Sequence, residues 1–263
     1  MARMTDALHT SSGPVSHFYD ALAEDYDAMT GFADRFARER SAFQLLVERF
    51  GVRTAADAGT GTGFHALLLA ELGVDVTAID VSRAMAERLR LHAAERELRI
   101  RVEVGDIRQL HKHTASGLDA IFCMGNTLAH MKDTRELEEA LRSFALALRP
   151  GGLVVIQLLN YDRILERRET IQNIRQVGGK TFVRFYVFEE DCIQFNVLQI
   201  WTEAGALRHQ LETVRLNPIG RSELCAGLEQ AGLVEIQSYG SIALEEYLGL
   251  ASKDLVVVAR MPA

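Results

Sequence analysis

Three glycines, Gly59, Gly61 and Gly63, stand between a short apolar run and a segment with helical spacing. A glycine cluster at a strand-to-helix turn lets the backbone approach a bound nucleotide, and an acidic residue about 20 positions further on can bind the ribose hydroxyls. Here Asp80 ends the next apolar run, 21 residues after Gly59. This combination predicts an α/β fold with a Rossmann-like sheet that holds a nucleotide at the carboxyl ends of its strands.

The segments around this turn alternate between two kinds of pattern. Short apolar runs end in Gly or Asp, and segments with helical spacing begin at Phe64, Arg83 and Thr134, with Thr134 as the expected N-cap of its helix. Such alternation is typical of βαβ units around a parallel sheet. A further helix is expected over 221–231. The expected strands cover 54–58, 75–80, 100–104, 118–124, 153–159, 234–239 and 254–260.

Two segments depart from this alternation. Residues 18–50 have helical spacing, which predicts an N-terminal helical cap. Residues 180–216 have a period of two, which predicts three antiparallel strands as a small β insertion. An insertion after the fifth strand emerges at the carboxyl edge of the sheet, so we expect a lid. The whole chain is then one domain over 1–263, made of a cap (16–50), a cofactor-binding core (51–177), an antiparallel β lid (178–216) and a C-terminal part of the sheet (217–263).

Charge and composition restrict the kinds of molecule that the protein is expected to bind. Lys and Arg number 29 against 36 Asp and Glu, a net charge of −7, which disfavours binding to a nucleic-acid backbone. Cys123, Cys192 and Cys225 form no C-x-x-C pair, so neither a disulfide framework nor a metal site is expected. Residues 1–16 lack the apolar segment of a signal peptide, and no 18-residue apolar run occurs. We expect a cytoplasmic protein with a small-molecule substrate and no membrane partner.

Asp57, two residues before Gly59, bears on which nucleotide binds. A dinucleotide would place its pyrophosphate at the helix N-terminus, where the carboxylate of Asp57 opposes it. A ligand that carries an ammonium and a sulfonium, such as S-adenosylmethionine, has the opposite preference. The adenine amine could then donate to Asp106 in the segment Gly105-Asp106-Ile107, although a turn aspartate is the alternative for Asp106 alone.

Taken together, Asp57–Gly63, Asp80, Gly105–Ile107 and the turn Leu148–Gly152 resemble the class I S-adenosylmethionine-dependent methyltransferases. The resemblance covers roughly residues 16–263. It implies S-adenosylmethionine as cofactor and a mostly parallel seven-stranded sheet whose last strand is antiparallel. Arg38 is expected to bind the methionine carboxylate, chosen from Arg35, Arg38 and Arg40. The expected cofactor-binding residues are Tyr19, Tyr26, Arg38, Asp57, Gly59, Thr60, Gly61, Gly63, Asp80, Val81, Met85, Gly105, Asp106, Ile107 and Met124.

Two other segments resemble glycine and sarcosine N-methyltransferases, namely Gly125–His130 and Asn160–Asp162. The resemblance suggests His130 as a catalytic base, with a backbone-bonded histidine as the alternative. It also suggests Asn126, Asn160 and Tyr161 as contacts of the methyl acceptor, with turn residues or a pocket wall as alternatives. Those enzymes carry His-Arg before Asn-Tyr-Asp, whereas this chain has Leu158-Leu159. The arginine that would pair an amino-acid carboxylate is therefore missing, and glycine is expected to be a poor acceptor.

The expected function is methyl transfer to a small molecule at nitrogen, with oxygen and sulfur as alternative acceptor atoms. Alignment and desolvation carry most of such a displacement, since proximity alone contributes roughly 7–11 kcal/mol. A protein or RNA methyltransferase is a second reading, but the fourth strand ends in Cys123-Met124-Gly125-Asn126 rather than Asn-Pro-Pro-Tyr. A cofactor-binding protein without activity is a third. A homo-oligomer formed through the β insertion is also open.

The carboxylates around the glycine turn predict a test of ligand choice. S-adenosylhomocysteine should bind in calorimetry and NAD should not. Asp80→Ala should weaken S-adenosylhomocysteine by more than about tenfold, because a charge-assisted bond in a closed site is worth roughly 1.5–3 kcal/mol. Tighter binding of NAD than of S-adenosylhomocysteine would contradict the prediction.

Overall fold

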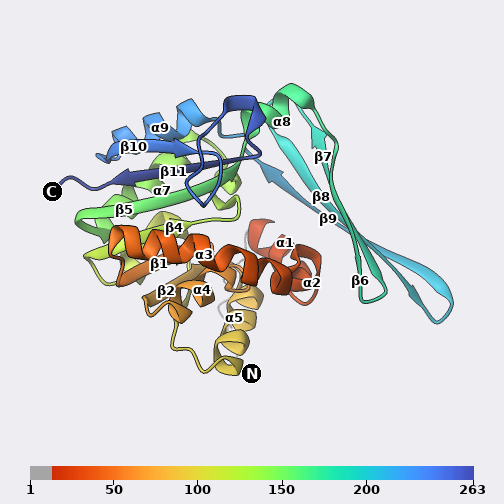
Figure 1. The fold of residues 1–263 in the computed structure, drawn as a ribbon. Coiled ribbons are helices and arrows are strands. Elements are labelled where there is room, and N and C mark those ends of the chain that lie inside the picture. The colour runs from red at the N-terminus through yellow and green to blue at the C-terminus, as the bar shows by residue number, and fades with distance from the viewer. Residues whose placement is uncertain (1–13) are drawn as a thin grey trace, which may run out of the picture.

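The computed structural model describes residues 14–263, and residues 1–13 of the expected domain lie outside that range (Figure 1). Seven strands form the main sheet in the order β10-β11-β5-β4-β1-β2-β3. β11 runs antiparallel to both of its neighbours, whereas the other pairs are parallel. The expected fold class is therefore confirmed. The strands are β1 (Thr54–Ala58), β2 (Asp75–Asp80), β3 (Arg101–Val104), β4 (Leu118–Cys123), β5 (Leu148–Leu159), β10 (Val234–Tyr239) and β11 (Asp254–Arg260).

Helices cover both faces of this sheet and bury a separate apolar cluster on each. One cluster contains Leu141 of α7 and Leu228 of α9, and the other contains Leu46 of α3 and Leu67 of α4. The cap of α7 is Asp133, whose carboxylate accepts from the Glu136 amide at 2.9 Å, so the expected cap at Thr134 is wrong by one residue. The helices are α4 (Phe64–Glu71), α5 (Arg83–Glu95), α6 (Leu110–His113), α7 (Thr134–Ala147), α8 (Tyr161–Arg167) and α9 (Arg221–Gln230), with short 3-10 turns at Ile107–Gln109, Thr127–His130 and Gly249–Ala251.

The N-terminal cap consists of three helices, α1 (Pro14–Leu22), α2 (Tyr26–Thr30) and α3 (Phe32–Phe50). Gly31 separates α2 from α3 with φ at +70°, a conformation that glycine adopts readily. The Asp20 carboxylate of α1 accepts from the Ser82 hydroxyl at 2.5 Å and from the Ala84 amide at 3.1 Å. These bonds fix α1 to the start of α5, above the carboxyl ends of the strands.

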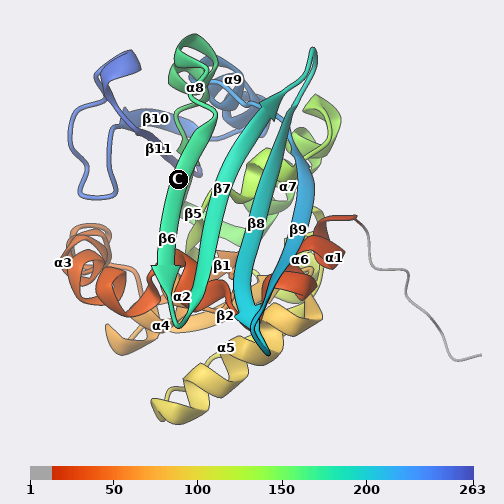
Figure 2. The ribbon, with the colours of Figure 1, turned by 90° about the vertical axis from the view of Figure 1, so that its right-hand side faces the viewer.

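A second, antiparallel sheet follows α8. Its strands are β6 (Ile171–Val177), β7 (Lys180–Phe188), β8 (Ile193–Glu203) and β9 (Ala206–Leu216), paired in that order. Figure 2 faces this sheet and shows the four strands side by side. The expectation of three strands missed β6, because its apolar residues Ile171 and Ile174 are three apart and it has no fully buried residue. β6 pairs with β7 through backbone hydrogen bonds, and such bonds do not require apolar residues at every second position of the sequence.

No helix within residues 14–263 is both long enough and apolar enough to span a lipid bilayer.

Candidate active site

A cavity of about 240 Å³ lies at the carboxyl ends of β1, β2, β3 and β4, beneath the N-terminal helices. Its wall brings together most of the cofactor-binding residues expected from the sequence. These are Tyr19, Tyr26, Gly59, Thr60, Gly61, Asp80, Val81, Gly105, Asp106, Ile107 and Met124. We call this space the first cavity.

The glycine turn is fixed to Asp80. One carboxylate oxygen of Asp80 accepts from the Gly61 amide at 2.7 Å, and the other accepts from the Ser82 amide at 2.9 Å. Burial raises the pKa of Asp80 to about 6, against the lowering effect of these bonds. Gly59 has φ at +76°, and a Cβ there would lie 2.3 Å from Thr127. The close approach of the turn to Thr127 thus requires glycine at position 59, and each oxygen of Asp80 can accept a further bond from a diol.

Asp57 lies behind the turn rather than in the cavity wall. The Thr60 hydroxyl donates to its Oδ2 at 2.6 Å, and its Oδ1 is buried without a hydrogen-bond partner within residues 14–263. Burial raises its pKa to about 7. Asp57 therefore supports the turn through Thr60, and any influence on a ligand acts through its charge rather than by contact.

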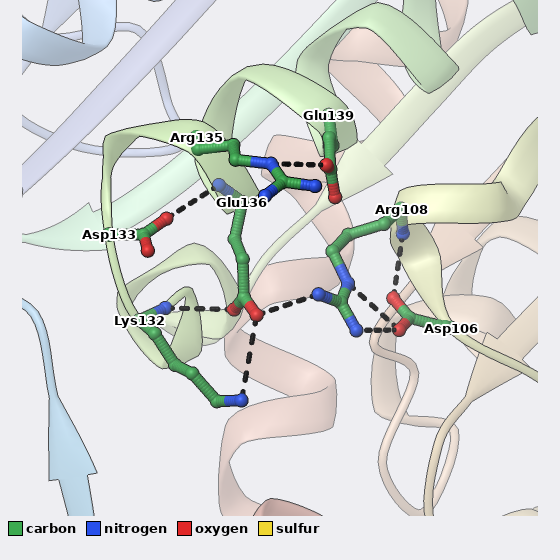
Figure 3. A network of polar contacts seen from close by, with 7 residues as sticks. All are labelled: Asp106, Arg108, Lys132, Asp133, Arg135, Glu136 and Glu139. Carbon is green, nitrogen blue, oxygen red and sulfur yellow. Dashed lines mark hydrogen bonds and ion pairs between the residues drawn. The ribbon is translucent and has the colours of Figure 1, made fainter.

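Four charged residues of a larger network border the first cavity at the end of β3 (Figure 3). They are Asp106, Arg108, Lys132 and Glu136. Oδ2 of Asp106 accepts from Nε and Nη2 of Arg108 at 2.9 and 2.5 Å, and Oδ1 accepts from the Arg108 amide at 2.9 Å. Nη1 of Arg108 donates to Glu136 at 2.7 Å. Glu136 also accepts from the Lys132 amide at 3.0 Å. The network thus joins the loop after β3 to α7 and to the segment that follows His130.

This network decides what Asp106 can do. Burial opposes its charge, but the bonds from Arg108 outweigh burial and hold the pKa of Asp106 below its ordinary value. The ionised carboxylate is an acceptor only. Because Arg108 saturates Oδ2, the remaining lone pair is on Oδ1, which can accept one N–H such as that of an adenine amine. Sequence reasoning missed Arg108 and Glu136, because nothing in their spacing places them on the same cavity.

His130 and Tyr19 form a hydrogen-bonded pair at 2.8 Å between Nε2 and the phenol oxygen. Burial lowers the pKa of His130 to about 4 and raises that of Tyr19 well above its ordinary value. Both side chains are therefore neutral near pH 7. Nδ1 of His130 is buried without a partner among the residues that the structure describes. The pair lines the first cavity and also a second one.

The second cavity, of about 310 Å³, lies between the N-terminal helices and the inner face of the antiparallel sheet. We call it the acceptor chamber, and its polar side chains are Tyr19, Tyr26, Thr30, Arg35, Asn126, His130, Gln157, Gln172, Arg184 and Tyr186. Apolar walls come from side chains such as Leu159 of β5 and Phe195 of β8. It adjoins the first cavity, since Tyr19, Tyr26 and His130 line both.

Of the expected acceptor contacts, Asn126 lines this chamber and the other two stand behind it. The Asn126 amide donates to the Tyr161 hydroxyl at 2.8 Å, and its oxygen accepts from the Leu159 amide at 3.1 Å. Asn160 is buried, caps α8 and donates to the carbonyls of Gly249 and Ser252. Tyr161 is likewise buried. Tyr161 therefore orients Asn126, whereas Asn160 fixes the start of α8 to the segment around Gly249 and Ser252.

Three expected cofactor residues lie outside the wall of the first cavity, besides Asp57. Arg38 is 71% exposed on α3, whereas Arg35 lines both cavities and pairs with Glu39 at 2.9 Å. Helical spacing alone could not choose between them. Met85 is buried, with its amide bonded to the Ser82 hydroxyl, and Gly63 packs against Leu89.

Comparison with known proteins agrees with this geometry. Residues 55–152 match a protein-family model described as a methyltransferase domain. Over these residues the chain is similar to a methyltransferase domain. A glycine/sarcosine N-methyltransferase of Parasynechococcus marenigrum (strain WH8102) is 32% identical over 170 residues, which cover 63% of this chain and 59% of that protein. One from Aphanothece halophytica is 28% identical over 151 residues, 57% of each chain. The chain spans less than two thirds of the length of these curated relatives.

Solved structures extend the likeness of the methyltransferase fold to nearly the whole chain. An S-adenosylmethionine-dependent methyltransferase from Clostridium acetobutylicum has a TM-score of 0.79 at 13% identity, over 93% of this chain and 99% of that one. The sugar N-methyltransferase KedS8 from Streptoalloteichus has a TM-score of 0.63 at 23% identity, over 100% and 99%. At these identities the likeness concerns the fold alone.

The network around Asp106 leads to a prediction for ligand binding in the first cavity. Arg108→Met should weaken S-adenosylhomocysteine by about tenfold, roughly 1.4 kcal/mol, because Asp106 loses the bonds that orient it. Calorimetry measures the change. Arg135→Met is the matched control on α7, since Arg135 is 84% exposed and pairs with Glu139. Unchanged affinity in Arg108→Met, or an equal loss in the control, would show that the network does not orient Asp106 for the ligand.

Proposed function

We propose that the protein is an S-adenosylmethionine-dependent methyltransferase that acts on a small molecule at nitrogen. The observation that carries the proposal is the pair of adjoining cavities. The first has a glycine turn and acidic side chains suited to a nucleoside. The second is lined by amides, aromatic rings and arginines, and the two share the neutral pair Tyr19 and His130.

The residues of the first cavity fit this cofactor. Asp80 would accept from the ribose hydroxyls, Asp106 from the adenine amine, and Arg35 would pair with the methionine carboxylate in place of Arg38. When bound, S-adenosylmethionine supplies a methyl group activated by a positive sulfur. The wall contains the acids Asp80, Asp106 and Glu136 and also the cations Arg35, Arg108 and Lys132, so groups of both signs are available to the ligand.

Tyr19 and His130 would orient the acceptor where the cavities meet. With a pKa near 4, His130 stays neutral above about pH 5 and can accept a hydrogen bond from an N–H group. So weak a base would remove a proton from the acceptor poorly. The acceptor nitrogen therefore binds in its neutral form, with its lone pair already free. Burial of this pair also excludes water, which strengthens polar contacts to the acceptor.

The choice of acceptor class rests on charge and on the relatives. Glycine/sarcosine and sugar N-methyltransferases among the similar proteins support nitrogen, with oxygen and sulfur as alternatives. The net charge of −7 argues against nucleic-acid partners, and we propose a cytoplasmic location without membrane partners.

Leu158 is buried and Leu159 offers no cation, as expected. The chamber nevertheless contains Arg184, so the lack of an arginine after β5 does not by itself exclude an anionic acceptor such as glycine.

Label transfer tests the proposed function. Protein incubated with methyl-labelled S-adenosylmethionine should place label in a small-molecule extract and not in RNA or protein fractions. Asp80→Ala should lose this transfer, whereas Asp75→Ala, at the exposed start of the same strand, should retain it. Label in RNA or protein would favour a macromolecular substrate. Binding without any transfer would indicate a cofactor-binding protein.

We also propose that the two faces of the antiparallel sheet have different roles. The inner face, with Phe182 and Tyr186 buried, forms a lid over the acceptor. The outer face carries an apolar row across all four strands, formed by Ile174, Val183, Leu198 and Leu211 in register. Ile174 and Leu211 are 63% and 51% exposed. The ends of these strands extend beyond the rest of the molecule in Figure 1, and such a surface suits contact with a second copy.

A pair of variants separates these roles. Phe195→Ala on the inner face should lower turnover at least about tenfold with little effect on S-adenosylhomocysteine affinity, because the lid closes less tightly. Leu211→Glu on the outer face should shift the protein to monomers in sedimentation without changing that affinity. If Phe195→Ala retains full turnover, the lid proposal is wrong. If wild-type protein is monomeric, the oligomer proposal is wrong.

A further inference from the structure

Arg184 of β7 stands in the wall of the acceptor chamber without an anionic partner. Its Nε is buried, and no hydrogen bond or ion pair joins its guanidinium to any residue between 14 and 263. A cation removed from water costs free energy unless an anion or hydrogen-bond acceptor replaces the lost hydration. The guanidinium therefore needs an anion or hydrogen-bond acceptor, and the described fold does not supply one.

The charges near Arg184 increase its need for an anionic partner. Arg35 pairs with Glu39 at 2.9 Å, and Arg175 pairs with Asp34 at 3.2 Å, so both nearby arginines have their own carboxylates. Burial lowers the pKa of Arg184, and the positive charges of Arg35 and Arg175 act in the same direction, whereas Tyr26 and Tyr186 oppose them. Arg184 is thus a cation beside two other cations.

No carboxylate in the chamber compensates for it. Among residues 14–263, those that line the chamber include no Asp or Glu. The strand register places Glu212 of β9 in the same row as Arg184, with β8 between them. Glu212 accepts a hydrogen bond from Gln210 and is not part of the chamber wall. The missing anion is therefore not a side chain of the described fold.

We propose that Arg184 binds an anionic group of the methyl acceptor, a carboxylate or a phosphate, and this proposal rests on the proposed function of the same chamber. The guanidinium fork matches either group. The reacting atom of the acceptor would lie near Tyr19 and His130, where the two cavities meet. Gln157 and Gln172 also line the chamber. At about 310 Å³ the chamber is within the range of small-molecule sites, roughly 300–1,000 Å³.

This position also links the acceptor to the lid. Arg184 belongs to the antiparallel sheet, whereas His130 follows β4 of the main sheet. An anion bound at Arg184 would connect the two sheets through the acceptor itself. An acceptor of this kind would thus favour the closed arrangement of the chamber.

The test uses full-length protein saturated with S-adenosylhomocysteine. Sodium acetate and sodium phosphate are the probes, titrated at constant ionic strength, with calorimetry and the thermal midpoint as readouts. Arg184→Met removes the cation, and Arg184→Lys keeps the charge without the fork. Arg208→Met is the matched control, because Arg208 of β9 is 57% exposed and pairs with Glu203.

Wild-type protein and Arg208→Met should bind one of the anions and gain thermal stability with its concentration. Arg184→Met should bind it at least about tenfold more weakly, and Arg184→Lys should fall between. Without anions, Arg184→Met should melt at or above the wild-type midpoint, because it removes a half-buried cation that has no anionic partner within residues 14–263. A response to acetate alone indicates a carboxylate, and a response to phosphate alone indicates a phosphate.

The proposal is overturned if neither anion affects wild-type protein, or if Arg184→Met responds as the wild type does. A large loss of stability in Arg184→Met without anions would also overturn it, since Arg184 would then be paired within the fold. S-adenosylhomocysteine binding, measured separately, reports on the proposed function. If that ligand fails to bind while the anion response persists, the cofactor assignment is wrong and the anion site remains.

Discussion

The Asp80 carboxylate connects the parts of the protein that form the first cavity. It accepts from the glycine turn after β1 and from the Ser82 amide at the start of α5. The Ser82 hydroxyl in turn donates to Asp20 of α1. One buried acid thus aligns the turn, a core helix and the N-terminal cap. Its burial cost is offset in part by two backbone amides, and its side chain lines the cavity where a ribose would lie.

The two cavities differ in their charged side chains. The acids Asp80, Asp106 and Glu136 line the first cavity together with the cations Arg35, Arg108 and Lys132, whereas within residues 14–263 the acceptor chamber has two arginines and no acid in its wall. An acceptor with a negative group would therefore meet opposite charge in the chamber. Between the two cavities the neutral pair of Tyr19 and His130 adds no charge that would compete. Separation of charge in a closed space of low dielectric constant acts strongly on position.

The antiparallel sheet completes the chamber and also presents a surface. Alternation along each strand sends Phe182 and Tyr186 inward and leaves the row through Val183 and Leu198 facing outward. The sheet therefore has two apolar faces, and only the inner one is covered by α1 and the core. A segment inserted after β5 can in this way serve both the acceptor and a second copy of the chain without altering the cofactor turn.

The sequence by itself determined the main sheet, the glycine turn and the expected roles of Asp80 and Asp106, because apolar periodicity and turn residues are local signals. It did not determine β6, which pairs through backbone bonds, nor the choice of Arg35 over Arg38, which lie one helical turn apart. Asn160 and Tyr161 matched a motif, yet in the fold Tyr161 bonds to Asn126 and Asn160 bonds to the Gly249 carbonyl. Tertiary structure alone brought Arg108 to Glu136 and left Arg184 without an anionic partner within residues 14–263, because these relations join side chains from separate elements. Local pattern fixes which elements form, whereas the packing of those elements decides which charges meet.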